Sequence, residues 1–300
     1  MSTLNSSDIF GQEIIRIWTI LRIAFNKFLR IDGVQWAGAF SFNMFFSLFP
    51  LVVLFVTIAS TFIDGNRAGE EIIYYIESYV PISGEMHSYI FNAITGVINE
   101  REQAGIISFV ILVWSALQCY ITLIVAVNHA WGTAVYTSWW RLPLRSFVLL
   151  GTTTCMIILG IVMPIMMRVT KDWFFVPNVS TSWLYDIGSY FIPFLIAFLG
   201  LSMFYILAPF RPTRFSEVWV AALFTTFLLL VSEILFAFYL QNFATLNVIY
   251  GTFGGIMALL LWIYLCGCIF IFGGCLCAAQ TETSSQLMKK ADVLTYKKIE

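Results

Sequence analysis

The sequence predicts an all-α membrane protein that crosses the bilayer with six helices. Of its 300 residues, 60% are hydrophobic and 11% are charged, against about 45–50% and about 25% in soluble domains. The mean hydropathy is +0.86. A soluble protein of this size could not cover its surface with so few charged residues. Lipid must therefore surround much of this chain. The formal net charge of −1 argues against a protein that binds nucleic acid by neutralising its phosphates, and the alternation of a membrane barrel is absent.

The six spans are the long stretches that contain no Asp, Glu, Lys or Arg. About 20 apolar residues are needed to cross about 30 Å of hydrocarbon as a helix. The last such stretch, between Glu217 and Glu282, is interrupted only by Glu233 and is long enough for two helices. It divides at the polar, glycine-containing segment 241–255. The predicted spans are 34–63, 105–130, 146–167, 187–209, 218–240 and 254–279.

The distribution of Lys and Arg predicts the orientation in the membrane, because cytoplasmic loops carry an excess of both. Twelve of the 16 fall on one side of the six-span model, and no loop contradicts the assignment. Both termini are therefore expected in the cytoplasm. The twelve are Arg16, Arg22, Lys27, Arg30, Arg141, Arg145, Arg211, Arg214, Lys289, Lys290, Lys297 and Lys298, against Arg67, Arg101, Arg168 and Lys171 outside.

The residue pattern of 1–33 predicts a cytoplasmic amphipathic helix before the first span. No charge-free apolar core of a signal peptide is visible in this segment. An apolar stripe recurs at helical spacing, and the basic residues lie off it. Such a helix can lie in the membrane interface or pack beneath the bundle, and the two interpretations are compatible. The stripe consists of Ile14, Ile17, Trp18, Leu21, Phe25, Phe28 and Leu29.

The remaining parts outside the membrane are an outer loop, 64–103, and a cytoplasmic tail, 281–300. The loop contains two amphipathic helical patterns on either side of Pro81. Loops of this length usually carry structure or function. The two short helices are expected to cover the outer mouth of the bundle, either as a lid or by simple packing.

No catalytic, metal or cofactor site is predicted. All six cysteines fall in spans, and the pairs Cys266/Cys268 and Cys275/Cys277 are spaced i, i+2, which places their side chains about 200° apart on a helix. Structural zinc prefers two to four residues between its cysteines. The two histidines belong to no catalytic motif. Small packing residues are therefore the better interpretation of the cysteines.

The candidate intramembrane site centres on Glu233, the one formal charge deep inside a span. Buried carboxyl groups usually face the bundle interior or a water-filled cavity. Asn43, Ser47, Ser115 and Gln118 are polar residues of the first two spans and could line that cavity. The site is either a proton-coupling or substrate contact, or a neutral acid that hydrogen-bonds a neighbouring helix.

Prolines and glycines mark further features of the spans. Pro50, Pro164 and Pro193 predict breaks in the first, third and fourth helices, and broken helices are where transporters build binding sites. Gly251 and Gly255 form a G-x-x-x-G motif, which favours close packing with another helix of this chain or of a second one.

Several motifs resemble the YihY family, also called the virulence factor BrkB family. The best matches are in the second half: Leu-Ala-Pro-Phe-Arg at 207–211, Phe-Ala-Phe-Tyr at 236–239, Tyr-Gly-Thr-Phe-Gly-Gly at 250–255 and Leu-Leu-Trp-Ile-Tyr at 260–264. In the first half, 40–50, 114–116 and 128–131 match its first two helices. The resemblance implies a bacterial inner-membrane protein with six helices and an envelope-related role. It supplies no agreed catalytic residues, and nothing in the sequence supports the family's old ribonuclease BN label.

Two functions follow from these observations. The first is a transporter or lipid-translocating protein of the cell envelope. The second is a non-transporting scaffold, with an envelope protein or another copy of the chain as its partner. Membrane lipids are expected contacts in either case, and nucleic acid is not. The transported substance cannot be read from the sequence.

Overall fold

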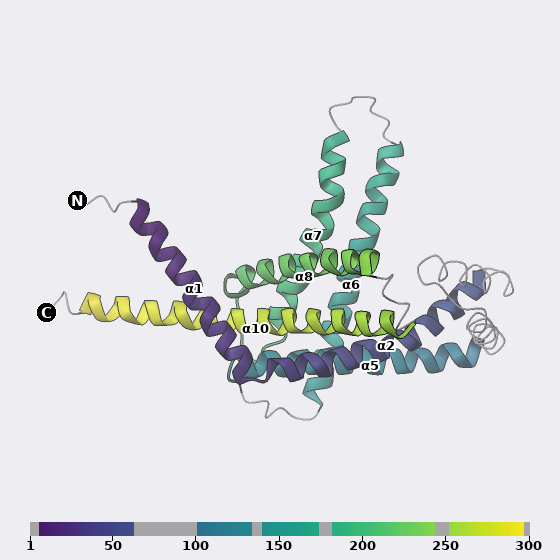
Figure 1. Cartoon of the computed structure of the whole chain (residues 1–300), viewed down its shortest axis with the longest axis horizontal. Helices are drawn as coiled ribbons and strands as arrows, with labels where there is room; N and C mark the ends of the chain where they lie inside the picture. The colour runs from purple at the N-terminus through teal and green to yellow at the C-terminus, as the bar shows by residue number, and fades with distance from the viewer. Residues whose placement is uncertain (1–5, 63–100, 134–139, 174–181, 244–251, 297–300) are drawn as a thin grey trace. The chain divides into compact units, whose positions relative to one another are not determined.

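The computed structural model describes residues 6–62, 101–133, 140–173, 182–243 and 252–296 (Figure 1). All regular secondary structure in these ranges is helical. The two short helices expected within 64–103 fall almost entirely outside the described residues. The helices are α1 (Ser6–Arg30), α2 (Gly33–Phe62), α5 (Arg101–Ala130), α6 (Arg141–Trp173), α7 (Ser182–Leu207), α8 (Phe215–Phe243) and α10 (Thr252–Tyr296).

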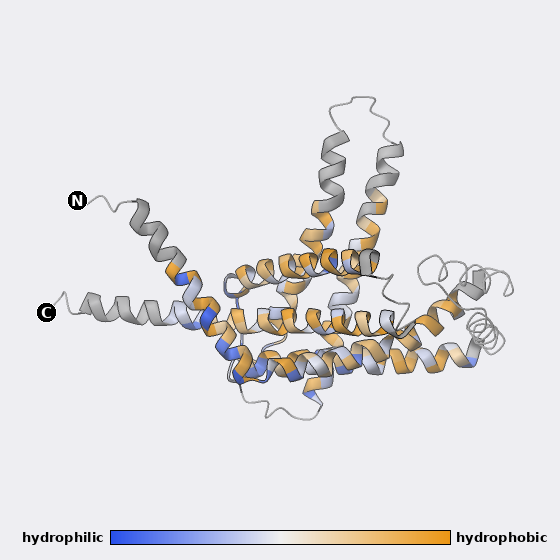
Figure 2. Cartoon of the chain, viewed as in Figure 1, coloured by the Kyte–Doolittle hydropathy of each residue, from blue (hydrophilic) through white to orange (hydrophobic). Residues whose placement is uncertain are grey.

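The predicted fold class is confirmed. Five helices, α2, α5, α6, α8 and α10, are long and apolar enough to cross a membrane, and the described apolar part of α7, Phe191–Leu207, is shorter. Figure 2 shows the hydrophobic colour along these helices and hydrophilic colour on α1 near α10. α8 ends at Phe243 and α10 begins at Thr252, which agrees with the predicted division of the last apolar stretch.

Large apolar side chains cover the outer surface of the spans. Phe42, Ile106, Ile161 and Ile234 are all more than half exposed, as are many others. A soluble protein rarely exposes contiguous apolar area of this kind. The outer surface of the helices is therefore a surface for lipid.

A tight turn separates α1 from α2. Asp32 has a φ of 55°, in the left-handed region, and its carbonyl accepts from Gln35 and Trp36 N–H at 2.9 and 3.2 Å. Gly33 follows, and a Cβ there would overlap the Phe28 ring. The turn therefore needs glycine at 33 and lets the amphipathic helix enter the first span without a linker.

α5 ends in a Schellman motif. Gly132 has a φ of 66° and donates to the His129 carbonyl at 3.0 Å, while Thr133 N–H donates to the Asn128 carbonyl at 3.1 Å. This pattern satisfies carbonyls at a helix end, and glycine is favoured at the left-handed position. It fixes where the chain leaves α5 and so positions the site described below.

The described chain forms two compact units. One comprises 1–37, 120–232 and 266–300, and the other comprises 38–119 and 233–265. In the first, Gly273 of α10 leaves no room for a side chain against the hydroxyls of Tyr205 and Thr225. The Tyr205 hydroxyl also donates to the Phe270 carbonyl at 2.8 Å. These contacts join α7, α8 and α10 at a point where only glycine fits.

α6 and α7 of the same unit form a hairpin, and Figure 1 shows them side by side. Glycines hold the two helices close. The Cβ position of Gly160 lies 3.7 Å from Ile196, and that of Gly200 lies 3.6 Å from Met156. Small residues at such contacts let helix backbones approach in lipid.

α1 packs on the same unit through its last turns. Ala24 and Phe28 are buried, and the Phe28 ring lies 6.2 Å from that of Phe272 in α10. Trp18 and Phe25 of the predicted stripe are instead 69% and 54% exposed. The packing therefore uses one narrow face, which includes Phe28 of the predicted stripe, while Ile17, Trp18, Phe25 and Leu29 of that stripe remain exposed.

The second unit has a smaller core. Phe236 of α8 stacks on Trp262 of α10 with centroids 4.8 Å apart and an interplanar angle of 10°. The Cβ position of Gly105 in α5 would lie 2.9 Å from the Thr57 methyl of α2. Aromatic stacking and close backbone approach thus pair the helices of this unit.

The helices are not interrupted at the three prolines. α2 continues through Pro50, α7 through Pro193, and α6 through position 164. The expectation of helix breaks is therefore not met in the structure. A proline removes one N–H donor from the helix, and in a membrane span the local backbone can adjust to satisfy the group it frees.

Candidate functional site: an arginine pocket where α6, α7 and α8 meet

Asn128, in the last turn of α5, organises the site. Its side chain is fully buried and uses its whole hydrogen-bonding capacity. Nδ2 donates to the carbonyls of Ile124 at 2.8 Å and Ala208 at 3.0 Å. Oδ1 accepts from Phe210 N–H at 2.7 Å and from the Thr133 hydroxyl at 2.9 Å. One side chain thus ties the end of α5 to segment 208–214, which connects α7 to α8.

Arg145 of α6 holds the same segment from the other side. Its Nη1 donates to the Pro209 carbonyl at 2.8 Å, and its guanidinium carbon lies 4.5 Å from the centre of the Phe210 ring. A planar guanidinium can donate in its plane while it stacks on a ring, which an ammonium group cannot do. Arg145 therefore fixes both the backbone and an aromatic side chain of the connection.

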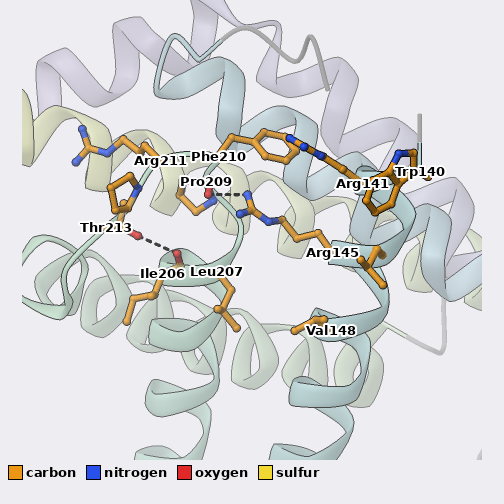
Figure 3. Close-up of a pocket in the computed structure, with 12 residues that line it drawn as sticks. Trp140, Arg141, Arg145, Val148, Ile206, Leu207, Pro209, Phe210, Arg211 and Thr213 are labelled. Atoms are coloured by element: carbon orange, nitrogen blue, oxygen red, sulfur yellow. Dashed lines mark hydrogen bonds between the residues drawn. The ribbon is translucent and has the colours of Figure 1, made fainter. Parts of the chain in front are cut away.

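Arg211 is engaged outside the pocket centre. Its guanidinium carbon lies 3.9 Å from the centre of the Trp131 ring, and its Nη2 pairs with Glu217 Oε2 at 2.9 Å. The same carboxylate accepts from Arg214 N–H at 3.3 Å, as expected of an acid in the first turn of a helix. Figure 3 shows the guanidinium turned away from that of Arg145. Arg211 thus anchors the start of α8.

A pocket of about 960 Å³ opens between these elements. Its guanidinium groups lie at one end and its aliphatic side chains at the other (Figure 3). We refer to it as the arginine pocket. It is lined by Trp140, Arg141, Leu144, Arg145, Val148, Ile206, Leu207, Pro209, Phe210, Arg211, Pro212 and Thr213.

The pocket lies at an end of the bundle where several helix termini meet. Lys27 of α1 pairs with Glu282 of α10 at 3.1 Å and donates to the Ala130 carbonyl at the end of α5 at 3.4 Å. Together with the contacts of Asn128 and Arg145, these bonds join all the connections predicted to be cytoplasmic. Antiparallel neighbours with short connections produce this grouping. The assignment of this end to the cytoplasm stays a prediction from the charges.

Comparison with known proteins decides the family. The model of the virulence factor BrkB family matches residues 24–293. The chain belongs to the virulence factor BrkB family. A UPF0761 membrane protein of Photobacterium profundum is 26% identical over 87% of this chain and 80% of its own length. One of Vibrio campbellii is 24% identical over 82% and 77%. No solved structure matches the chain.

One relative of this BrkB-family chain carries an enzyme-like name. The Bacillus subtilis protein named "Putative ribonuclease-like protein YfkH" is 24% identical over 85% of this chain and 93% of its own length. That name describes the Bacillus protein, and no enzymatic activity of this chain follows from it. The resemblance noted in the motifs is confirmed, and the chain is a multi-pass membrane protein of this family.

Glu233 does not face the interior of this BrkB-family chain. Its side chain is exposed, whereas the preceding Ser232 is buried and lies 3.8 Å from Cys266 Sγ. Adjacent residues on a helix point about 100° apart, so only one of the two can face the interior here. In the single chain the Glu233 side chain therefore lies on the exposed face of α8, and its role as an intramembrane site stays a prediction.

The four polar residues expected around Glu233 are placed in α2 and α5. Ser47 and Ser115 are buried, and each donates back to the carbonyl three residues earlier, Met44 at 2.6 Å and Leu112 at 3.0 Å. Asn43 and Gln118 are half-buried and interact within the chain. The hydroxyls are thus satisfied by their own helices.

The structure describes Gly255 and all six cysteines. Gly255 has no atom of the described chain within 4 Å of its Cβ position, and Gly251 lies outside the described residues. Close packing of α10 occurs instead at Gly273 and Gly274. No disulfide joins the six cysteines, and the described residues contain no cluster of three His, Cys, Asp or Glu side chains that could hold a metal ion.

Sequence reasoning did not identify the arginine pocket. In the sequence, Arg141, Arg145 and Arg211 indicate only the orientation in the membrane. The one usable signal was the face of α6 formed by Arg141, Leu144, Arg145 and Val148 at i, i+3, i+4 and i+7. The return of segment 208–214 to that face, over 60 residues later in the chain, is a tertiary contact that spacing alone does not predict.

Proposed function

We propose that this protein moves a lipid-like, amphipathic substrate between the leaflets of the membrane, and that the arginine pocket receives it. The observation that carries the proposal is the composition of the pocket. Guanidinium groups and an aromatic ring stand at one end, and aliphatic side chains of α6 and α7 line the other. Ligand sites typically combine apolar walls with a few placed polar groups.

The position of the pocket fits this role. Arg141 and Arg145 occupy the first turns of an apolar helix of spanning length, Arg141–Met163, so they belong near a membrane surface. Trp140 precedes them, as aromatic residues often do at the interface. A lipid that entered from the leaflet would meet the aliphatic wall with its chains and the guanidinium groups with its headgroup.

Reconstitution into liposomes tests the proposal. Liposomes contain a lipid labelled on its headgroup, and an impermeant reductant bleaches the outer leaflet. The full-length chain is expected to expose the inner-leaflet label, whereas protein-free liposomes retain about half the signal. Absence of lipid movement and of ion flux by correctly folded protein would reject a transport function.

A blocking substitution links the movement to the pocket. Val148 is half exposed and lines the pocket, whereas Val162, on the same helix, is exposed and does not line it. Val148→Trp should slow lipid movement several-fold because the indole fills the aliphatic end. Val162→Trp adds the same bulk at a lipid-facing position and should leave the rate unchanged. Equal rates in the two variants would dissociate transport from the pocket.

A non-transporting scaffold is the second candidate. The open surface at Gly255 favours it, since nothing in the described chain fills that position and small residues accept a neighbouring helix in lipid. A stable dimer that dissociates on Gly255→Leu, in protein that moves no lipid, would favour the scaffold.

A further inference from the structure

We infer that the arginine pocket binds a phosphate group carried by an amphipathic molecule, with Arg141 and Arg145 as its donors. This inference rests on the function proposed above and names the class of substrate. It begins with the charges of the pocket. Arg211 has the carboxylate of Glu217 as its partner. Among the described residues, Arg141 and Arg145 have none.

The two arginines share one face of α6, one turn apart. Arg145 donates through one nitrogen to the Pro209 carbonyl, and Arg141 lies 5.8 Å from the Trp140 ring centre. Each guanidinium has five N–H donors, so most remain available. Like charges at i, i+4 repel each other on a helix. An anion between them would remove that repulsion and accept from both.

A phosphate suits this pair better than a carboxylate. It offers three or more acceptor oxygens, and planar guanidinium groups bind it through paired N–H bonds. Figure 3 shows both guanidinium groups beside the Phe210 ring. The stacking of Arg145 on Phe210 at 4.5 Å holds one donor group in place before a ligand arrives.

The aliphatic wall points to acyl chains behind the phosphate. Leu144 and Val148 continue the face of α6 that begins with Arg141, and both are more than half exposed. Seven residues of helix cover about 10 Å, so the wall extends from the guanidinium groups towards the membrane interior. Ile206 and Leu207 of α7 line the opposite side. The order of the groups matches a phospholipid that lies along α6.

Binding measurements with the full-length chain in detergent separate the parts of this ligand. Three probes are compared. Dioleoyl phosphatidic acid carries both the phosphate and the acyl chains, dioleoylglycerol lacks the phosphate, and glycerol phosphate lacks the acyl chains. Phosphatidic acid is expected to bind most tightly. If glycerol phosphate binds equally well, the phosphate site stands and the lipid source is rejected.

Substitutions assign the donors. Arg141 is exposed, so Arg141→Gln should fold normally and weaken phosphatidic acid binding about fivefold, while dioleoylglycerol binding stays unchanged. Arg141→Lys keeps the charge but loses the paired N–H bonds, so it should weaken binding less than Arg141→Gln does. Arg214 is exposed and does not line the pocket, so Arg214→Gln is the matched control. Equal binding by wild type and Arg141→Gln, or equal losses in Arg141→Gln and Arg214→Gln, would overturn the inference.

The liposome assay distinguishes this inference from the proposed function. Movement of zwitterionic lipid without any phosphate-dependent binding would leave the function standing and reject the phosphate site. Phosphate-dependent binding that Arg141→Gln weakens, in protein that moves no lipid, would support the site and reject the transport function.

Discussion

Asn128 provides the sharpest test of how the site is held together. Asn128→Leu removes four side-chain hydrogen bonds at a fully buried position with little change in volume. Two of the four partner groups keep another hydrogen bond. The Ile124 carbonyl also accepts within the helix, and the Thr133 hydroxyl also donates to the Asn128 carbonyl at 3.0 Å. The Ala208 carbonyl and the Phe210 N–H lose their partner.

The cost follows from those two groups. A buried polar group left without a partner costs about 1–3 kcal/mol, so the loss should be about 4 kcal/mol. In a chain of 300 residues, whose unfolding entropy is about 0.6 kcal/mol/K, that corresponds to a fall in Tm of roughly 6 °C. Segment 208–214 should loosen first, and the arginine pocket with it.

Thermal unfolding of the purified protein in detergent measures the effect. Asn26 of α1 is exposed, so Asn26→Leu makes the same substitution at the surface and should shift Tm by no more than about 2 °C. Thr133→Val removes the hydroxyl that donates to Asn128 Oδ1 and to the Asn128 carbonyl and should cost about 1 kcal/mol. If Asn128→Leu melted within about 2 °C of Asn26→Leu, the network would not stabilise this end of the bundle.

Four further outcomes are expected. Gly273→Ala should lower Tm or abolish folding because its methyl group would overlap the hydroxyls of Tyr205 and Thr225, whereas Gly255→Ala, with nothing within 4 Å, should melt like wild type. Arg145→Lys should keep the topology but lower Tm and slow lipid movement, since an ammonium group cannot both bond Pro209 and stack on Phe210; wild-type values of both would contradict this role. An impermeant maleimide should label cysteine introduced at Ser83 but not at Ser285 in intact spheroplasts, and the reverse pattern would reject the predicted orientation. Purified protein should leave tRNA precursors intact with Mg²⁺, Mn²⁺ or Zn²⁺, and cleavage that a point substitution in this chain abolishes would establish a nuclease.

The spans were predictable because the physics that sets them is local. A stretch such as 34–63 needs only length and the absence of charge to be recognised, and it agrees with α2 to within one residue at each end. The polar interruption at 241–255 similarly located the end of α8 and the start of α10. A helix satisfies its own backbone, so no knowledge of its neighbours is required.

Facing direction was less predictable, as Glu233 shows. A rotation of 100° along α8 decides whether Glu233 or Ser232 is buried. In a helix of a soluble protein, the polar face would show which side chains point outward. α8 is apolar on nearly every face, so its sequence does not show this. The same problem affected Gly255 and Gly273 of α10: both glycines were visible in the sequence, and only packing against α7 and α8 distinguishes them.

The arginine pocket depends on contacts between residues distant in sequence, and its residues also satisfy a simpler requirement. Either Lys or Arg at position 145 would satisfy the positive-charge rule for topology. That rule therefore does not explain why residue 145 is an arginine. The contacts with Pro209 and Phe210 do require a planar guanidinium. Arg211 likewise needs its flat group to stack on Trp131 while it pairs with Glu217. At the end of this bundle, the charges of these side chains predict the orientation, and the planar shape of their guanidinium groups makes the contacts that build the pocket.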